Sequence, residues 1–269
     1  MRVLNNRLVV VRGGGDIATG VIQKLKRVGF DVVVLESDKP SSIRRNVCLS
    51  EAIYDDYAIV EDIKGVRAIN MQSVKEIISN GDIPVITDKK GEYIKSLKPI
   101  AVVDAILAKR NLGTTKDMAE VTIGLGPGFC AKDDVDIVVE TMRGHNLGRL
   151  IFKGSALANT GIPGDVAGVT KERVIYSKES GSFKGSSKIG DVVKEGEVLG
   201  YIENYEVIAT IDGVLRGIIR DGYEVRKGLK IADIDPRINQ KENCDTISDK
   251  ARTIGGAVIE GLLLSLNKY

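Results

Sequence analysis

The chain has 269 residues, which is enough for one large domain or two ordinary ones. Its 43% hydrophobic and 28% charged residues exclude a disordered, a fibrous or a membrane-embedded chain. There are 39 Lys and Arg residues against 37 Asp and Glu, no Trp, and only 4% aromatic residues. The chain therefore lacks the basic surface and the stacking groups that nucleic-acid-binding proteins use, and we expect no nucleic-acid partner.

Cysteine and histidine use indicates the cellular setting. Cys48, Cys130 and Cys244 are widely separated and form no CxxC pair, which is typical of reduced thiols in a cytosol. His145 is the single histidine, which argues against a histidine-rich metal site, and we predict no metal. The first four residues lead directly into a polar segment, and no apolar run approaches the ~20 residues of a membrane span. We expect a cytoplasmic protein with no signal peptide and no membrane partner.

The first forty residues follow the pattern of a dinucleotide-binding unit. A β-branched strand over residues 8–12 leads into Gly13-Gly14-Gly15-Asp16-Ile17-Ala18. Apolar residues at helical spacing follow over 17–28, and a second buried strand over 32–35 ends at Glu36. A strand, a glycine turn, a helix and a strand that ends in an acid favour the binding of a nucleotide.

The residues of the turn have separate roles in this interpretation. Gly13 permits the tight turn, Gly15 lets the backbone reach a pyrophosphate, and Ala18 keeps the helix close to the strand. The N-terminus of the helix attracts phosphate, and the acid at the end of the second strand accepts a ribose hydroxyl. Alternatively the glycines serve packing alone, and Asp16, which adds a negative charge to the turn, leaves both interpretations open. The cofactor-binding residues predicted here are Gly13, Gly14, Gly15, Ala18 and Glu36.

Two adjacent arginines follow this unit. Arg44 and Arg45 can clamp a phosphate or carboxylate through their planar guanidinium groups, or can stay solvated on an exposed loop. We assign both to the cofactor site.

Further strands alternate with helices, which predicts a mostly parallel sheet covered on both faces. The strands are expected over 66–69, 83–86 and 99–104. Because ligands gather at the carboxyl ends of such strands, Asp88 and Asp104 are expected near the glycine turn.

After residue 113 the chain becomes rich in glycine and loops. A strand over 121–125 runs into Gly126-Pro127-Gly128 with no helix behind it, and a polar segment over 143–149 follows. We assign Gly126, Gly128 and Arg143 to the cofactor site. His145 is a candidate general acid or base, with a hydrogen bond that holds a turn as the alternative, and Asp104 is the second catalytic candidate.

An internal repeat occupies the last third of the chain. Gly190 and Gly222 are 32 positions apart, as are Gly196 and Gly228, and the residues around them match. Two such glycine-turn hairpins resemble the biotinyl/lipoyl-like, barrel-sandwich hybrid fold. No lysine lies between Lys194 and Lys227, so covalent biotin or lipoate has no attachment point. We interpret this module as a structural or docking element.

These patterns together predict an α/β fold. A Rossmann-like parallel-sheet domain that binds a nucleotide is expected over 1–112, and a glycine-rich β/loop region over 113–182. The lipoyl-like module without an attachment lysine follows over 183–237. A C-terminal helix over 238–269 has Ser248 as its N-cap.

Short motifs along the whole chain carry a family resemblance. They are Arg12-Gly13-Gly14-Gly15-Asp16-Ile17-Ala18-Thr19-Gly20, Ile43-Arg44-Arg45, Ser50-Glu51-Ala52, Val103-Asp104-Ala105, Ala108-Lys109-Arg110-Asn111, Gly124-Leu125-Gly126-Pro127-Gly128-Phe129, Glu140-Thr141-Met142-Arg143-Gly144-His145, Asn159-Thr160-Gly161, Asp233-Ile234-Asp235-Pro236-Arg237 and Ile247-Ser248-Asp249-Lys250-Ala251-Arg252. Together they resemble the accessory proteins of the selenium-dependent molybdenum hydroxylase system.

The resemblance implies a maturation factor for xanthine-dehydrogenase-like enzymes that carry labile selenium beside molybdopterin. It implies a molybdenum hydroxylase client as the partner and a nucleotide, NAD(P) or another, or the phosphate-bearing molybdopterin as the ligand. Cys48 and Cys130 are the positions to examine if selenium is carried as a thiol adduct. An NAD(P)-dependent oxidoreductase that acts on a small substrate is the alternative, and His145 is then the single histidine that could serve as its proton donor. A third possibility is an interaction scaffold with a vestigial glycine turn.

Overall fold

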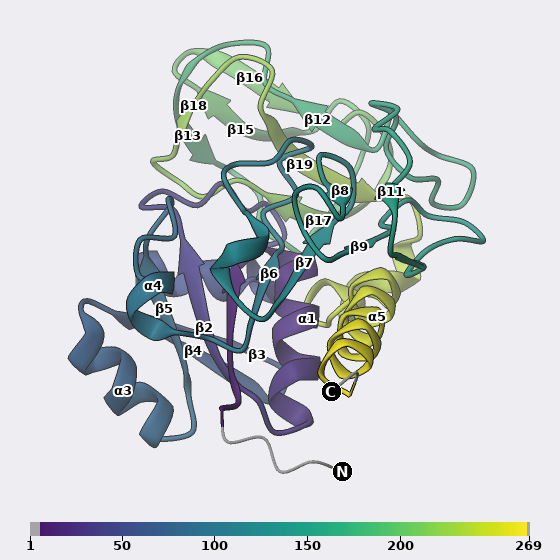
Figure 1. The fold of residues 1–269 in the computed structure, drawn as a ribbon. Helices are drawn as coiled ribbons and strands as arrows, with labels where there is room; N and C mark the ends of the chain where they lie inside the picture. The colour runs from purple at the N-terminus through teal and green to yellow at the C-terminus, as the bar shows by residue number, and fades with distance from the viewer. Residues whose placement is uncertain (1–5, 268–269) are drawn as a thin grey trace. The chain divides into compact units, whose positions relative to one another are not determined.

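The computed structural model describes residues 6–267, which divide into two compact units (Figure 1). The first, here called the sheet unit, holds the described residues up to 40, residues 48–159 and those from 247 onward. The second, the repeat unit, holds residues 41–47 and 160–246. The expected boundaries after residues 112, 182 and 237 do not coincide with these units. The first four residues, on which the expected absence of a signal peptide rests, lie outside the described part.

The sheet unit is built on one twisted sheet. Within residues 6–267 nine strands join in the order β10-β9-β7-β6-β1-β2-β5-β4-β3. All neighbours pair in parallel except β3 with β4 and β10 with β9, which are antiparallel. The strands are β1 (Leu8–Arg12), β2 (Asp31–Glu36), β3 (Tyr57–Val60), β4 (Ile63–Ala68), β5 (Ile83–Thr87), β6 (Ala101–Asp104), β7 (Val121–Leu125), β9 (Ile137–Val139) and β10 (Leu150–Ile151). A separate pair joins β8 (Cys130–Ala131) to β11 (Gly154–Ser155).

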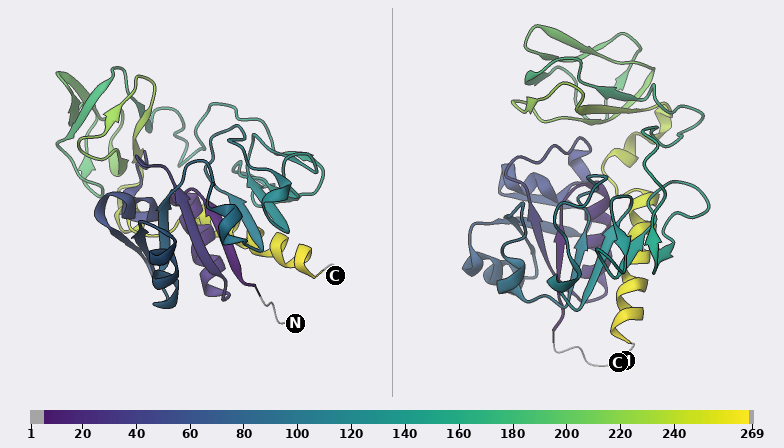
Figure 2. Two further views of the ribbon diagram at one scale, coloured as in Figure 1. Left: turned by 60° about the vertical axis from the view of Figure 1, so that its left-hand side comes forward. Right: turned by 45° about the horizontal axis from the view of Figure 1, so that its top comes forward.

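Helices and short 3-10 turns complete the sheet unit. Its helices are α1 (Asp16–Arg27), α2 (Ala52–Asp55), α3 (Met71–Ser79), α4 (Ile94–Leu97) and α5 (Asp249–Leu266), and its 3-10 turns are Leu49–Glu51 and Lys116–Met118. Helix α5 lies alongside α1 in both Figure 1 and Figure 2. A Cβ on Gly20 would lie 2.7 Å from the Ala251 Cβ, and one on Gly255 would lie 2.7 Å from the Gly20 carbonyl oxygen. The glycines of both helices are therefore needed for this close contact.

The fold class expected from the sequence is wrong. In place of a parallel-sheet domain followed by a β-rich region, the structure has a mixed nine-stranded sheet, an antiparallel pair of strands, two four-stranded antiparallel sheets and a C-terminal helix. Strands β7, β9 and β10 extend the first sheet past residue 112, and α5 returns to pack on α1. Buried apolar runs indicate strands, but they specify neither direction nor the sheet that a strand joins.

The repeat unit contains two four-stranded antiparallel sheets within residues 174–235, ordered β12-β19-β17-β14 and β16-β15-β13-β18. The strands are β12 (Val174–Tyr176), β13 (Gly181–Gly185), β14 (Val192–Val193), β15 (Val198–Ile202), β16 (Tyr205–Ile208), β17 (Gly213–Ile218), β18 (Glu224–Val225) and β19 (Lys230–Asp235). The 3-10 turns of this unit are Arg45–Val47 and Ile238–Cys244.

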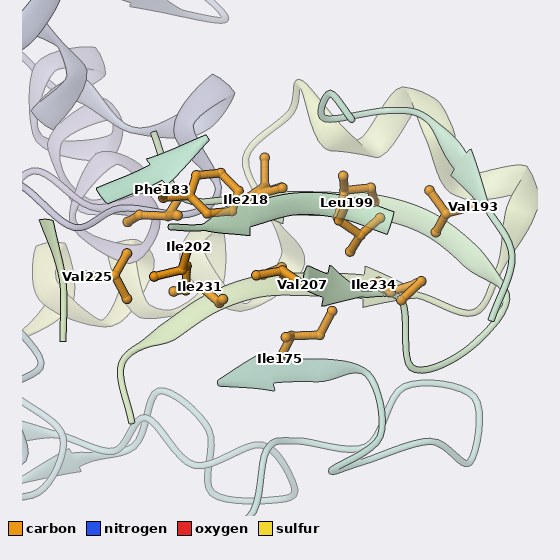
Figure 3. Packing of buried hydrophobic residues seen from close by; sticks show 14 residues of the cluster. Ile175, Phe183, Val193, Leu199, Ile202, Val207, Ile218, Val225, Ile231 and Ile234 are labelled. Carbon is orange, nitrogen blue, oxygen red and sulfur yellow. The ribbon is translucent and has the colours of Figure 1, made fainter. Parts of the chain in front are cut away.

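The internal repeat is visible in this strand order. An offset of 32 residues carries β12–β15 onto β16–β19, and the same change of labels converts one sheet order into the other. Equivalent positions meet in a single core: Leu199 with Ile231, Ile202 with Ile234, and Val193 with Val225 are all buried there (Figure 3). Each copy thus contributes strands to both sheets, and neither sheet is complete without the other copy.

Candidate functional site: a glycine turn and two lysines

The candidate site lies where the chain leaves β1 and β6, which are neighbours in the middle of the sheet. From β1 the chain runs through α1 to β2 on one side, and β6 leads to β7 on the other. The carboxyl ends of two such strands flank the crevice in which open α/β sheets hold ligands. A Cβ on Gly13 would come within 3.0 Å of the Ala105 carbonyl oxygen, so the two connections touch here.

Hydrogen bonds within the chain shape the glycine turn. Gly13 has a φ of +95°, and its N–H donates to the Leu35 carbonyl at 2.8 Å. The Gly14 N–H donates to Glu36 Oε2 at 2.7 Å, and its carbonyl accepts from the Ser50 N–H at 2.9 Å. Because Glu36 occupies the Gly14 N–H, that donor is not available to a ligand.

Two donors of the turn, the N–H groups of Gly15 and Ala18, have no partner within residues 6–267. Gly15 is the N-cap of α1, and its N–H forms no hydrogen bond with any residue among 6–267. Asp16 Oδ1 accepts from the Ile17 N–H at 2.8 Å, which places the negative charge of Asp16 at the start of the helix. Ala18 is buried in the first turn of α1. The turn thus keeps the N–H groups of Gly15 and Ala18 unpaired within residues 6–267, whereas Glu36 occupies the Gly14 N–H that the sequence pattern assigns to a ligand.

Two lysines that the sequence analysis did not assign complete the site. Lys250 lies in the first turn of α5, and burial lowers the pKa of its ammonium group. The positive charges of Lys109 and Arg143 lower this pKa further, whereas Asp16 and Glu140 raise it. Partial burial also lowers the pKa of Lys109, although this residue stays solvent-accessible. Neither lysine forms an ion pair or a hydrogen bond within the described part of the chain.

The loop that carries Lys109 has an unusual backbone. Leu107 and Lys109 have φ values of +59° and +63°, a conformation that side chains other than glycine rarely adopt. Such residues cluster at ligand sites, where the surrounding structure maintains the strain. Both lysines belong to motifs of the family resemblance, which is the sequence signal that would have identified them.

The remaining acidic and basic residues around the site already have partners. Glu140 is buried and accepts from the N–H groups of Met142 and Leu157, at 2.7 and 2.8 Å. The Arg143 guanidinium donates two hydrogen bonds of 2.8 Å to Asp249, the residue before Lys250. This bidentate pair ties the predicted ligand loop to the start of α5.

Gly126 and Gly128 bring their loop close to other backbone. Gly126 has a φ of +77°, and its N–H donates to the Val139 carbonyl at 2.8 Å. A Cβ on Gly128 would lie 2.6 Å from the Arg110 Cα, next to Lys109. These glycines therefore position the lysine loop, and the structure shows no free donor that they aim at a ligand within residues 6–267.

Arg44 and Arg45 lie in the repeat unit. Arg44 Nη2 donates to the Asn243 and Thr246 carbonyls at 3.3 and 3.4 Å. Arg45 Nε donates to the Ile218 carbonyl at 2.9 Å. Of the three arginines predicted to share one cleft, Arg143 alone belongs to the same unit as the glycine turn.

The predicted acids at strand ends stabilise the fold locally. Asp104 pairs with the buried Arg12, at 3.5 Å between Oδ2 and Nη1, and accepts from the Thr114 hydroxyl at 2.6 Å. Asp88 accepts three backbone N–H groups from residues 91–93. His145 is exposed and forms no hydrogen bond within the part of the chain that the structure describes.

The cysteines are not poised as nucleophiles. Cys48 and Cys244 are buried, and burial raises the pKa of the Cys244 thiol. The pKa of Cys130 is raised, chiefly by Asp133. Among residues 6–267 no three His, Cys, Asp or Glu side chains are placed to hold a metal ion. No helix in that range combines the length and apolar character needed to cross a membrane.

Comparison with known proteins finds a close relative by sequence. The chain is 45% identical over 263 residues to the "Uncharacterized protein YqeB" of Escherichia coli strain K12. The match covers 98% of this chain and 48% of that protein, so the chain spans about half the length of the curated relative it matches. No family model matches the chain.

Solved structures show only distant likeness. The product-bound ectoine utilization protein EutE (DoeB) of Ruegeria pomeroyi is 13% identical, with 86% of this chain and 58% of that chain covered and a TM-score of 0.25. A succinylglutamate desuccinylase of a Silicibacter species is 12% identical, with 85% and 84% covered and a TM-score of 0.26. The succinylglutamate desuccinylase/aspartoacylase of Rhodobacter sphaeroides is 12% identical, with 85% of each chain covered and a TM-score of 0.28. TM-scores in this range do not establish a common fold.

Proposed function

We propose that the sheet unit binds a small phosphate-bearing cofactor between the glycine turn and the lysine loop. In this proposal the chain acts as a cytoplasmic accessory factor in the maturation of molybdenum hydroxylases. The observation that carries the ligand proposal is the pair Lys109 and Lys250, which have no partner within residues 6–267 and lie beside the start of α1.

The local charges favour an anion. The charge of Arg143 is matched by Asp249, and backbone N–H groups satisfy Glu140. At Lys250 the positive charges of Lys109 and Arg143 are opposed by the carboxylates of Asp16 and Glu140. Two ammonium groups that repel each other in a partly desolvated place are stabilised when an anion binds between them.

The donors fit a single phosphate better than a diphosphate. A dinucleotide turn offers several backbone N–H groups to a pyrophosphate, but here Glu36 holds the Gly14 N–H, which is therefore lost to a ligand. Lysine ammonium groups supply the missing donors as mobile point charges. Molybdopterin, with its terminal phosphate, therefore suits the site better than NAD(P) does.

The accessory role comes from the family resemblance, and the geometry gives it support. Motifs far apart in the sequence meet at this site: Arg143 pairs with Asp249, Gly128 contacts Arg110, and α1 packs on α5. Residues that act together on one ligand explain why separate motifs carry the resemblance. The repeat unit, with no attachment lysine, is proposed to dock the client hydroxylase.

Ligand-dependent melting tests the proposal. Purified protein is heated with NAD, NADP, ATP, CTP or extracted molybdopterin, and a ligand at 100 times its dissociation constant adds ~2.7 kcal/mol to the free energy of unfolding. The gain should disappear in Lys109→Gln and Lys250→Gln. It should persist in Lys75→Gln, which changes an exposed lysine of α3.

Two results would contradict the proposal. An unchanged gain in both lysine variants would move the ligand elsewhere, and turnover of NADH on a small substrate without a client would favour an oxidoreductase. A client hydroxylase that matures equally well without this protein would refute the accessory role alone and leave the ligand site standing.

A further inference from the structure

The repeat unit contains a hollow that neither the family resemblance nor the proposed cofactor site accounts for. Its volume is about 490 Å³, within the range of pockets that hold small organic ligands. All of its lining residues come from the repeat unit: residues 45–46, Phe183, residues 185–189 and residues 218–221. The hollow is thus a property of this unit by itself.

The two copies of the internal repeat form most of its wall. The offset of 32 residues that relates the copies carries residues 186–189 onto residues 218–221. The same offset relates Gly185 to Gly217 and Lys188 to Arg220. A basic side chain at the same position of each copy therefore reaches the same hollow, and Arg45 adds a third from a segment outside the repeat.

Several polar groups in this wall have no partner within residues 6–267. The ammonium of Lys188 forms no ion pair with any residue among 6–267, and the hydroxyls of Ser186 and Ser187 have no hydrogen-bond partner there. The Arg45 Nε–H donates to the Ile218 carbonyl, and the Nη groups of Arg45 make no hydrogen bond within that range. Hydroxyl, ammonium and guanidinium groups together match the oxygens of a phosphate.

The charge of the wall has the sign that an anion requires. Lys188 and Arg45, which form no ion pair within residues 6–267, line the hollow with one carboxylate, Asp221, whose Oδ1 accepts from the Gly185 N–H at 2.7 Å. The apolar side chains of Phe183, Ile218 and Ile219 are almost fully buried beneath the hollow. The hollow is also much larger than a bare oxyanion needs.

We infer that the repeat unit binds a small organic phosphomonoester in this hollow. Its phosphate contacts Lys188, Arg220 and the two serine hydroxyls, and its organic part lies over the apolar floor. The inference does not depend on the glycine-turn site, because no residue is shared. It gives the repeat unit a ligand without the covalent attachment that the missing lysine excludes.

Calorimetric titration of the whole chain tests the inference, with phenyl phosphate as the probe and inorganic phosphate and phenol as comparisons. The titrations are run in wild type and in Lys109→Gln, which removes a contribution from the sheet unit. We expect saturable binding of phenyl phosphate in both, at least tenfold tighter than that of either comparison compound. Lys188→Gln and Arg220→Gln should each weaken it at least tenfold.

Lys184→Gln is the matched control, because Lys184 is exposed on β13 and does not line the hollow. Its affinity should stay within twofold of wild type, and amide shifts in the NMR spectrum should localise to residues 185–189 and 218–221. The inference is overturned if both charge variants bind as wild type does, if Lys109→Gln alone abolishes binding, or if inorganic phosphate binds as tightly as phenyl phosphate. Unchanged melting temperatures of the variants show that any loss is not due to unfolding.

Discussion

Substitution of Asp104 tests whether the acidic residues at the strand ends take part in catalysis or stabilise the fold. Arg12 and Asp104 are each only 1% exposed, and the pair joins the neighbouring strands β1 and β6. Arg12 also donates to the Lys89 and Leu112 carbonyls, at 3.2 and 3.4 Å, and Thr114 bonds to both members of the pair. No open face of this carboxylate is directed to a ligand, so we expect Asp104→Ala to act on stability.

The expected loss follows from what the substitution leaves behind. Removing one partner of a buried pair costs about 3–5 kcal/mol, because the other charge stays buried and uncompensated. Arg12 keeps two carbonyl acceptors, and the distance of 3.5 Å to Asp104 is long for an ion pair, so the lower end applies. We expect Asp104→Ala to lower the free energy of unfolding of the sheet unit by about 3 kcal/mol.

Hydrogen exchange of the β1 and β6 amides measures this loss within the sheet unit, and urea unfolding followed by circular dichroism measures it for the whole chain. The double variant Arg12→Met/Asp104→Leu should recover most of the stability, since it leaves no buried charge unpaired. Glu92→Ala, which removes an exposed pair with Lys90 at 4.0 Å, should cost less than ~0.5 kcal/mol. A cost below ~1 kcal/mol for Asp104→Ala, accompanied by loss of ligand binding, would refute this reasoning.

Three further predictions concern single sites. Because the pKa of Lys250 is lowered in the folded protein, the unfolded chain holds this proton more tightly, and the free energy of unfolding should rise with pH up to the ordinary pKa of 10.5. This rise should vanish in Lys250→Met, and a rise that persists would assign it to another group. Gly128→Ala should lower the free energy of thermal unfolding by ~1–3 kcal/mol more than Gly113→Ala does. Both glycines have positive φ, but a Cβ on Gly128 would clash with Arg110, whereas no described atom lies within 4 Å of a Cβ on Gly113. Equal losses would exclude the clash with Arg110 as the cause. The carboxyl group of Asp62 should titrate with a pKa of about 2 in NMR, chiefly because Arg27 donates a hydrogen bond to it. Its contribution to stability is complete above the ordinary pKa of 3.8 and is lost as pH falls through 2. In Arg27→Gln the pKa of Asp62 should rise towards 3.8, and an unchanged pKa would make Gln23 the main donor.

Local pattern predicted the parts of the fold in which sequence neighbours are also neighbours in space. The strand expected over 8–12 is β1, and the helix and the strand that follow it are α1 and β2. Strand β10, with two residues, is too short for its periodicity to reveal it, and the place of β9 and β10 in the large sheet depends on pairing with β7. The predicted fold class was wrong at these strands, because the sheet that a strand joins depends on partner strands far away in the sequence.

The candidate site shows the same division between local and distant contacts. The glycine turn is continuous in sequence, and its place between β1 and α1 was predicted from local pattern, whereas the hydrogen bond from Gly14 to Glu36 was not. Lys109 and Lys250 are far apart in the sequence, and what brings them together is the packing of α5 on α1 through Gly20 and Gly255. Glycines inside a helix read as weak points in isolation, although here they allow the contact that completes the site.

Binding of a ligand explains best why the sheet unit keeps destabilising features beside its glycine turn. Leu107 and Lys109 hold a backbone conformation that costs of order 1–3 kcal/mol each, and the ammonium of Lys250 loses hydration without gaining a partner among residues 6–267. Glycine in place of Leu107 and Lys109, and a neutral side chain in place of Lys250, would relieve each cost without disturbing β1 or β6. Natural sequences retain such costs where binding offsets them, and the three lie together at the crevice between β1 and β6. Relief of all three should therefore stabilise the free protein and remove the ligand-dependent gain in melting temperature, an outcome that a purely structural role for the turn does not produce.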